Sequence, residues 1–140
     1  MTGASSGFGA LIARELEKEG YYVYASARRK EKLEELATDN IQAAPLDVTK
    51  AKSCEDVFNH IMAEKGRIDV LVNNAGYGLM SPIEDASMTA IKDQFDVNVY
   101  ACVRLMQLVT PVMRKQAFGL IINMSSVVGH LSMPMLGYYA

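Results

Sequence analysis

A glycine-rich run near the start of the chain has the residue types that a phosphate-binding loop needs. Residues 2–9 read TGASSGFG, and a stretch with helical spacing follows from about Ala10 to Glu19. Glycines permit a tight turn and let the backbone approach a pyrophosphate, whose negative charge is favoured at a helix N-terminus. A triphosphate-binding loop needs Gly-Lys followed by Ser or Thr, whereas here Gly9 precedes Ala10. The run therefore favours a dinucleotide over a nucleoside triphosphate, although by itself it is equally compatible with a purely structural turn.

The residues that follow the next β-rich run indicate which dinucleotide would bind. An NAD site usually places an acidic residue about twenty residues past the glycine loop, where it holds the ribose 2′-hydroxyl. Here residues 25–29 read ASARR and contain no acid. The planar guanidinium of Arg28 suits a 2′-phosphate, and charge-assisted hydrogen bonds contribute about 1.5–3 kcal/mol each. We expect Arg28 to bind this phosphate, whereas Arg29 could assist it or, like Lys30, belong to the solvated start of the next helix.

Strands and helices must alternate to position these residues. Runs rich in β-formers lie at 21–25, 68–72 and 120–124, with a weaker run at 41–46. Leu33 and Leu36, then residues 57, 58, 61 and 62, have the spacing of helical faces, and residues 88–115 are expected to form one long helix. Gly20 and Gly66 suit helix C-termini, and Ser53 with Asp56 resembles a capped helix start.

This alternation predicts an α/β fold, a doubly wound parallel sheet of Rossmann type. Pro45 lies within the run 41–46, and proline cannot donate to a strand ladder, so this strand should be an edge. In the strand order 3-2-1-4-5-6 the third strand is the edge, which agrees. A further apolar strand is expected before Thr2, between the strands at 21–25 and 68–72.

Composition excludes several classes of partner. The net charge is −2 and half of the residues are hydrophobic, so there is no broad basic field for nucleic acid or an anionic membrane. Cys54 and Cys102 lack close Cys or His neighbours, which predicts two reduced thiols in a cytoplasmic protein and no metal site. No apolar run reaches membrane-spanning length.

Five motifs in order resemble those of the short-chain dehydrogenase/reductase family. TGASSGFG matches the TGxxxGxG cofactor loop, and residues 73–76 match the NNAG motif. Asp47-Val48 resembles the acidic dipeptide that meets the adenine, and Asn98 falls at the position of a catalytic asparagine. Ser126 and Tyr139 have the family's serine-to-tyrosine spacing, and residues 74–84 (NAGYGLMSPIE) resemble the branch of 17β-hydroxysteroid and retinol dehydrogenases.

The resemblance implies a set of cofactor contacts: Gly3, Ser5, Ser6, Gly7, Phe8, Gly9, Arg28, Arg29, Asp47, Val48, Asn74, Ala75 and Gly76. It implies NADP as the cofactor. It also implies that Tyr139 exchanges a proton with the substrate oxygen, that Ser126 hydrogen-bonds this oxygen, and that Asn98 holds a water in the proton relay. Each of these residues also has a purely structural interpretation: Ser126 could be a helix cap, Tyr139 a packing residue and Asn98 a hydrogen-bonded core amide. Only the spacing to Tyr139 favours Ser126 over Ser125 as the catalytic serine.

The expected function is hydride transfer between NADP(H) and a carbonyl or secondary alcohol. Apolar residues such as Met80, Leu131 and Met133 suggest an apolar substrate, although loop packing explains them nearly as well. The resemblance to the 17β-hydroxysteroid and retinol dehydrogenase branch implies a substrate of steroid or retinoid type. Alternatives are a 3-oxoacyl-carrier-protein reductase of the same family and a non-catalytic NADP-sensing protein. We expect residues 1–140 to be the N-terminal part of one oxidoreductase domain. This part should be inactive alone, because the lysine that lowers the pKa of the catalytic tyrosine in the family would follow Ala140. Family members commonly form homodimers or homotetramers, and we expect the same of the complete protein.

Overall fold

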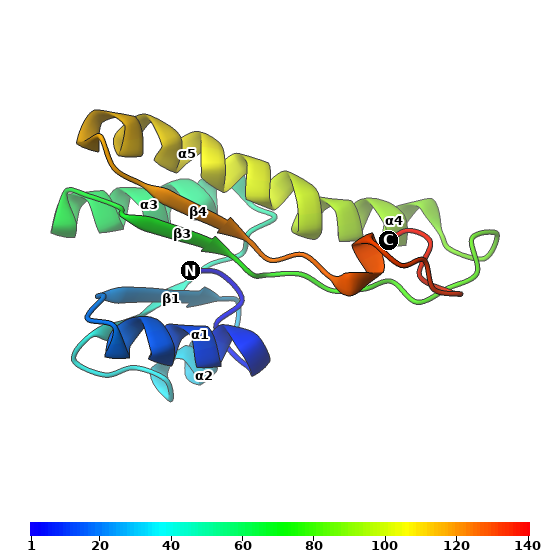
Figure 1. Ribbon diagram of the computed structural model, residues 1–140, viewed down its shortest axis with the longest axis horizontal. Coiled ribbons are helices and arrows are strands. Elements are labelled where there is room, and N and C mark those ends of the chain that lie inside the picture. Colours follow the sequence, from blue (N-terminus) through cyan, green and yellow to red (C-terminus); the bar gives the residue numbers. More distant parts are fainter.

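Short parallel strands alternate with helices along the chain (Figure 1). The computed structural model describes all residues from Met1 to Ala140. The strands are β1 (Val23–Ala27), β2 (Ile41–Pro45), β3 (Val70–Asn73) and β4 (Leu120–Asn123). The helices are α1 (Gly7–Lys18), α2 (Lys30–Glu34), α3 (Ala51–Lys65), α4 (Met88–Phe95) and α5 (Ala101–Gln116), with a π-helical turn η1 (Asp96–Tyr100) and a 3-10 turn η2 (Val127–Gly129). None of the helices combines the length and the apolar character needed to cross a lipid bilayer.

The extended residues at the start of the chain connect two parallel strand pairs. β1 pairs with β2, and β3 pairs with β4. The Ser26 N–H of β1 donates to the carbonyl of Met1 at 2.9 Å, and the Thr2 N–H donates to the carbonyl of Val72 in β3 at 2.9 Å. The spatial order is therefore β2, β1, residues 1–4, β3 and β4. This confirms the predicted strand order and the predicted edge position of β2, which ends at Pro45.

Two separate apolar cores lie on opposite faces of these strands. Helices α1 and α2 lie beside β1 and β2, whereas α3 and α5 lie beside β3 and β4 (Figure 1). The first core contains Ala4, Ala13, Val23, Ala25, Leu33, Leu36 and Ile41. The second contains Leu46, Val48, Cys54, Leu71, Ala101, Leu105, Val109 and Met113. Helix layers on both faces of a parallel sheet are the defining feature of a doubly wound α/β fold.

Three expectations about local structure need correction. The strand predicted at 21–25 begins at Val23, because the Tyr21 N–H instead donates to the carbonyl of Leu16 at the end of α1. Ser53 does not cap a helix start: α3 begins at Ala51, and the Ser53 hydroxyl accepts a hydrogen bond from the Asp47 N–H. The long helix expected over 88–115 is interrupted by η1, a turn of wider hydrogen-bond spacing that carries Asn98.

Candidate cofactor and active site

The glycines of the loop are required for two reasons, a left-handed backbone at Gly3 and Gly7 and close packing at Gly3 and Gly9. Gly3 and Gly7 have φ values of 69° and 55°, in the left-handed region that favours glycine. A Cβ atom on Gly9 would overlap the carbonyl of Gly3 and lie 2.8 Å from Nδ2 of Asn74. The loop therefore makes its tight turn against the segment after β3 and leads directly into α1, whose first N–H groups carry the partial positive charge that attracts phosphate.

Thr2 fixes the glycine loop beside the segment that follows β3. Its Oγ1 accepts hydrogen bonds from the N–H groups of Asn74 and Ala75, each at 3.0 Å. In return, Nδ2 of Asn74 donates to the carbonyl of Thr2 at 3.1 Å and to that of Gly3 at 3.3 Å. The TGxxxGxG and NNAG motifs thus form one hydrogen-bonded unit, although about seventy residues separate them in the sequence.

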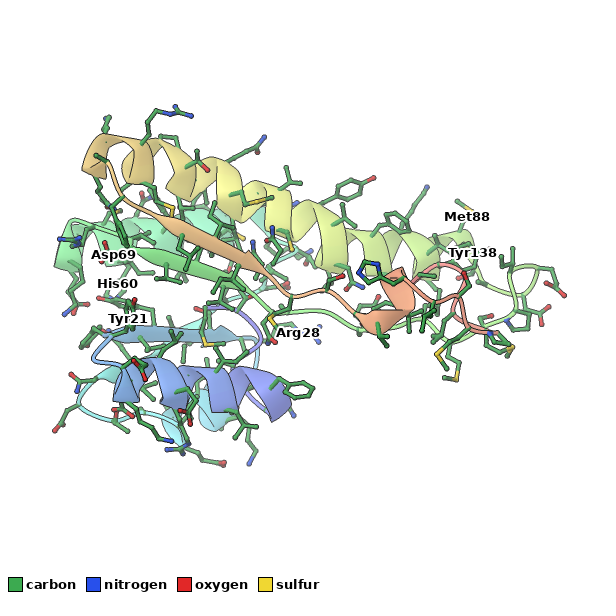
Figure 2. All side chains as sticks on the ribbon, viewed as in Figure 1. Tyr21, Arg28, His60, Asp69, Met88 and Tyr138 are labelled. Carbon is green, nitrogen blue, oxygen red and sulfur yellow. The ribbon has the colours of Figure 1, made fainter.

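An arginine and two serines form a basic, polar cluster next to this unit. Nη2 of Arg29 donates to the hydroxyl oxygen of Ser5 at 3.0 Å and of Ser6 at 3.3 Å. Arg28 is exposed, lines the same groove and lies at the end of β1 (Figure 2). Sequence reasoning favoured Arg28 as the anion ligand. The structure instead places Arg29 on the glycine-loop serines, a contact across more than twenty residues that no local pattern indicates.

Asp47 and Val48 follow β2 and are held by two different partners. Oδ1 of Asp47 accepts hydrogen bonds from the Thr49 hydroxyl at 2.7 Å and the Thr49 N–H at 3.0 Å. The bond from the Thr49 hydroxyl holds the pKa of Asp47 below its ordinary value, and the charges of Lys50 and Arg28 act in the same direction. The carbonyl of Val48 accepts from Nη1 of Arg104 at 2.6 Å. This loop is therefore fixed from its own residues and from α5.

These elements line one groove at the carboxyl ends of β1, β2 and β3. Its volume is about 1170 Å³, above the range of about 300–1000 Å³ that small-molecule sites usually have. The lining includes most of the expected cofactor contacts: Gly3, Ser5, Ser6, Phe8, Gly9, Arg28, Arg29, Asp47, Val48, Asn74, Ala75 and Gly76. Gly7, the remaining expected contact, provides the left-handed turn at the start of α1. Ligands of α/β sheets bind in such a crevice, and its glycines, helix N-terminus and arginines suit a phosphorylated dinucleotide.

Asn98 and Tyr139 meet the same short segment, residues 76–78. Nδ2 of Asn98 donates to the carbonyl of Tyr77 at 2.8 Å, and its Oδ1 accepts from the Tyr77 N–H at 3.1 Å. A Cβ atom on Gly78 would contact the Tyr139 ring at 3.5 Å. The fold therefore brings two of the three expected catalytic residues to neighbouring positions, Tyr77 and Gly78, of one segment that begins at the cofactor groove.

Ser126 lies on the segment after β4 and has a local hydrogen bond. Its Oγ accepts from the Val128 N–H at 3.3 Å and caps η2. Ser126 therefore lies at the start of η2. Its hydroxyl forms no hydrogen bond with the Tyr139 hydroxyl in this structure. Sequence reasoning missed Gln94, a fully buried side chain of α4 that contacts the residue before Tyr139.

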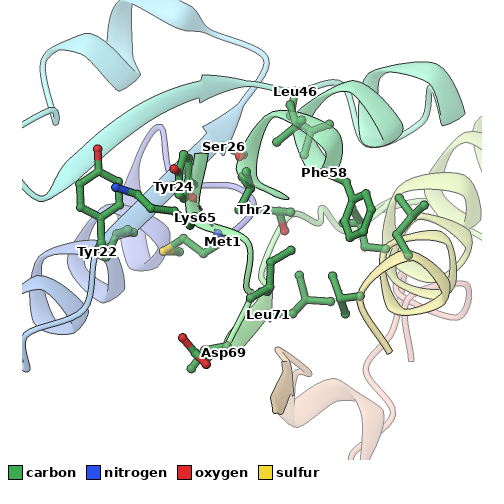
Figure 3. Close-up of a pocket in the computed structure, with 18 of the residues that line it drawn as sticks. Met1, Thr2, Tyr22, Tyr24, Ser26, Leu46, Phe58, Lys65, Asp69 and Leu71 are labelled. Carbon is green, nitrogen blue, oxygen red and sulfur yellow. Dashed lines mark hydrogen bonds between the residues drawn. The ribbon is translucent and has the colours of Figure 1, made fainter. Parts of the chain in front are cut away.

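A second cavity between β1 and β3 contains none of the expected site residues. It has a volume of about 290 Å³ and is lined mostly by apolar side chains, among them Tyr24, Leu46, Phe58 and Leu71 (Figure 3). It lies beside residues 1–2, in the sheet layer between β1 and β3. Because it contains none of the expected residues and none of the loop glycines, it is not the candidate site.

Comparisons with known proteins agree with this geometry. A sequence model described as "short chain dehydrogenase" matches residues 1–140. The chain is 36% identical over 140 residues to a 3-ketodihydrosphingosine reductase of Bacteroides thetaiotaomicron, covering 100% of this chain and 51% of that protein. It is 38% identical over 133 residues to an NADP-dependent 3-hydroxy acid dehydrogenase of Escherichia coli, covering 92% and 54%.

Solved structures give the same result. The closed form of a serine dehydrogenase complexed with NADP⁺ superposes with a TM-score of 0.93 at 37% identity, covering 99% of this chain and 57% of that one. The chain thus spans about half the length of the relatives that it matches.

Proposed function

The chain belongs to the short-chain dehydrogenase family, and from this premise we propose that its protein transfers a hydride between NADP(H) and a carbonyl or secondary alcohol. The observation that carries the proposal is the hydrogen-bonded unit of the glycine loop and residues 74–75 beside the Arg29–Ser5–Ser6 cluster. This arrangement combines a pyrophosphate cradle with a cation at the position where an NAD enzyme has an acid. The NADP named for two of the relatives supports the same cofactor.

Residues of this chain would hold the cofactor at its phosphates and at its adenine and nicotinamide rings. The backbone N–H groups after Gly7 face the pyrophosphate, and Arg29, with the hydroxyls of Ser5 and Ser6, binds the 2′-phosphate. Arg28 adds positive charge to the same groove. Asp47 and Val48, which line the groove, would contact the adenine, and residues 74–76 would lie toward the nicotinamide. The bound nicotinamide supplies or accepts the hydride.

Tyr139 would then exchange the proton that hydride transfer requires. Carbonyl reduction leaves an alkoxide, and a phenol O–H beside it donates a proton as the negative charge develops. Ser126 would donate its hydroxyl proton to the same oxygen, which its hydroxyl can do while its Oγ accepts from the Val128 N–H at 3.3 Å. Asn98 would hold the loop at Tyr77 and also a water of the proton relay, since its amide oxygen and nitrogen each have one partner and can form one more hydrogen bond.

We further propose that the substrate is apolar, of steroid or retinoid type. Two loops that meet beyond the nicotinamide end carry exposed apolar side chains: Met80, Ile83, Leu131, Met133 and Met135. The Ser81 N–H donates to the carbonyl of Met135 at 2.8 Å, so these loops lie together. An apolar surface of this kind favours a ligand that removes it from water.

The protein is also proposed to form a homodimer or homotetramer through its longest helical segment. Phe95, Val99, Tyr100 and Val103 are 38–57% exposed along η1 and its flanking helices. Burying this apolar face against a second copy would be favourable. Light scattering of the purified protein should show a multimer, and Val103→Glu should shift it toward the monomer.

The experiment that tests the proposed reaction compares four forms of the protein. The wild type should oxidise NADPH with a panel of apolar ketones faster than with small polar ones. Tyr139→Phe should lower kcat about a hundredfold or more while NADPH affinity stays the same, because the phenol acts on substrate. Ser126→Ala should also lose activity, whereas Ser125→Ala, which removes an exposed hydroxyl, should lose little. Turnover by Tyr139→Phe near the wild-type rate would refute the assignment, and NADPH binding without any turnover would favour the sensor interpretation.

A further inference from the structure

One polar side chain outside the groove is fully buried and joins the two loops near Tyr139. Gln94 of α4 is 2% exposed, although most of the helix is exposed. Its Oε1 accepts a hydrogen bond from the Leu79 N–H, and its Nε2 donates to the carbonyl of Tyr138. A buried amide stabilises a structure only where its polar atoms are satisfied. Here both ends are satisfied by backbone groups from two different loops.

The contact with Tyr138 fixes the peptide group that leads into Tyr139. The carbonyl of this peptide accepts from Gln94, and its N–H, which belongs to Tyr139, donates to the carbonyl of Leu136 at 2.9 Å. A peptide group is planar, so hydrogen bonds at both of its ends fix its orientation. That orientation sets the direction in which the Tyr139 side chain leaves the backbone.

The contact with Leu79 fixes the surface on which the Tyr139 ring packs. Gly78 lies against this ring, and Leu79 is the next residue. Gln94 therefore holds both the backbone that carries Tyr139 and the loop that supports its ring. Tyr138 and Met88, the first residue of α4, lie at the same end of the molecule (Figure 2).

We infer that Gln94 is a positioning residue that sets the place of the Tyr139 phenol in the active site. The inference rests on the proposed function, in which Tyr139 exchanges the proton. Two other hydrogen bonds tie the same loops: the Ser81 N–H to the carbonyl of Met135, and the Tyr138 phenol to the carbonyl of Ile83 at 2.6 Å. Neither bond involves the peptide before Tyr139. Loss of the Gln94 contacts should therefore leave the loops together but release this peptide.

The test uses two substitutions in the complete protein. Gln94→Met has similar length and keeps the packing, but it cannot form either hydrogen bond. It should lower kcat roughly ten- to a hundredfold, as expected for a misplaced catalytic group, with little change in NADPH Kd or Tm. Gln107→Met is the matched control, because Gln107 is an exposed amide on α5 without a hydrogen bond, and its kcat should equal that of the wild type.

Gln94→Glu adds a pH readout that a purely structural role would not give. The introduced carboxylate can accept from the Leu79 N–H but cannot donate to the carbonyl of Tyr138. When protonated, it can do both, and burial raises the pKa of such a carboxyl. The kcat of this variant, relative to the wild type at the same pH, should therefore rise as the pH falls. This readout also serves if Gln94→Met does not fold.

The outcomes separate this inference from the proposed function. Wild-type kcat in Gln94→Met, or a parallel loss of kcat, NADPH affinity and Tm, would overturn the positioning role. A flat ratio of kcat against pH for Gln94→Glu would overturn it as well. If Tyr139→Phe is inactive in the same assays, the proposed function holds even where the positioning role of Gln94 is contradicted. If Tyr139→Phe is active, both proposals fall together.

Discussion

Asn98 holds the backbone of Tyr77 by both of its polar groups. The side-chain amide of Asn98 donates to the carbonyl of Tyr77 at 2.8 Å and accepts from its N–H at 3.1 Å, in the manner of two paired strands. The π-helical turn η1 presents this amide to the loop, and Gly76 lies beside it, where a Cβ would be 3.3 Å from Oδ1. The asparagine thus connects the long helical segment to the loop between the cofactor groove and Tyr139.

This relationship predicts the effect of Asn98→Asp. The introduced carboxylate can still accept from the Tyr77 N–H, but it would face the carbonyl of Tyr77 without a proton to donate. Because the carboxylate and the carbonyl of Tyr77 would repel each other at this partly exposed contact, the loop should open more often and kcat should fall. Hydrogen exchange at the Tyr77 amide measures the opening. Unchanged exchange together with lost activity would show that Asn98 acts on the reaction directly and not through the loop.

Arg29 should determine the preference for NADPH over NADH. Arg29→Ala removes the guanidinium held by Ser5 and Ser6, and each lost charge-assisted bond to a 2′-phosphate is worth about 1.5–3 kcal/mol. The ratio of kcat/KM for NADPH to that for NADH should fall about tenfold or more.

Two variants control for a general loss of positive charge. Lys30→Ala removes an exposed lysine that pairs with Glu34, and it should leave the cofactor preference unchanged. Arg28→Ala should have a smaller effect than Arg29→Ala, since only Arg29 forms hydrogen bonds with the loop serines. A larger effect of Arg28→Ala would support Arg28 as the main ligand of the 2′-phosphate, as the sequence pattern predicts.

Gly9 and Gly7 should respond differently to alanine. A methyl group on Gly9 would overlap the carbonyl of Gly3, so Gly9→Ala must push the glycine loop from residues 74–75 and should abolish NADPH binding. At Gly7 a Cβ meets nothing within 4 Å, but the φ of 55° costs a non-glycine residue about 1–2 kcal/mol. Gly7→Ala should therefore lower Tm while retaining measurable NADPH affinity. Equal affinities in the two variants, measured by titration calorimetry, would contradict the predicted difference.

Thr49 should contribute stability at neutral pH and lose that contribution in acid. The Thr49 hydroxyl lowers the pKa of Asp47, so its stabilisation is present above the ordinary pKa of an aspartate and is lost as the pH falls through the folded-state value. Thr49→Val should lower the free energy of unfolding by no more than about 1 kcal/mol at pH 7, since Asp47 is partly exposed to solvent.

Denaturant unfolding between pH 7 and pH 2 measures this contribution. The difference between wild type and Thr49→Val should shrink as the pH falls. Thr49→Ser keeps the hydroxyl and should behave like the wild type, and Thr89→Val, at an exposed position of α4, should show no pH-dependent difference. A difference that is constant with pH would indicate lost packing and no effect on Asp47.

The features predicted from the sequence are those that depend on neighbouring residues. Glycines at positions with positive φ, such as Gly3 and Gly66, and the apolar periods of α3 and β3 are local properties. The proline at position 45 predicted the edge strand, because a missing N–H is also local. From these, the α/β class, the strand order and the cofactor loop follow without coordinates.

Only the tertiary structure decided which polar side chains meet. Arg28 and Arg29 are adjacent in the chain, but only the path of the backbone after β1 places Arg29 on Ser5 and Ser6. Gln94 has no distinguishing feature in the sequence. In the structure it is buried between Leu79, which lies 15 residues earlier in the chain, and Tyr138, which lies 44 residues later. A hydrogen bond forms over about 3 Å, so its partner depends on the folded position of two distant segments, which residue types and spacing do not specify.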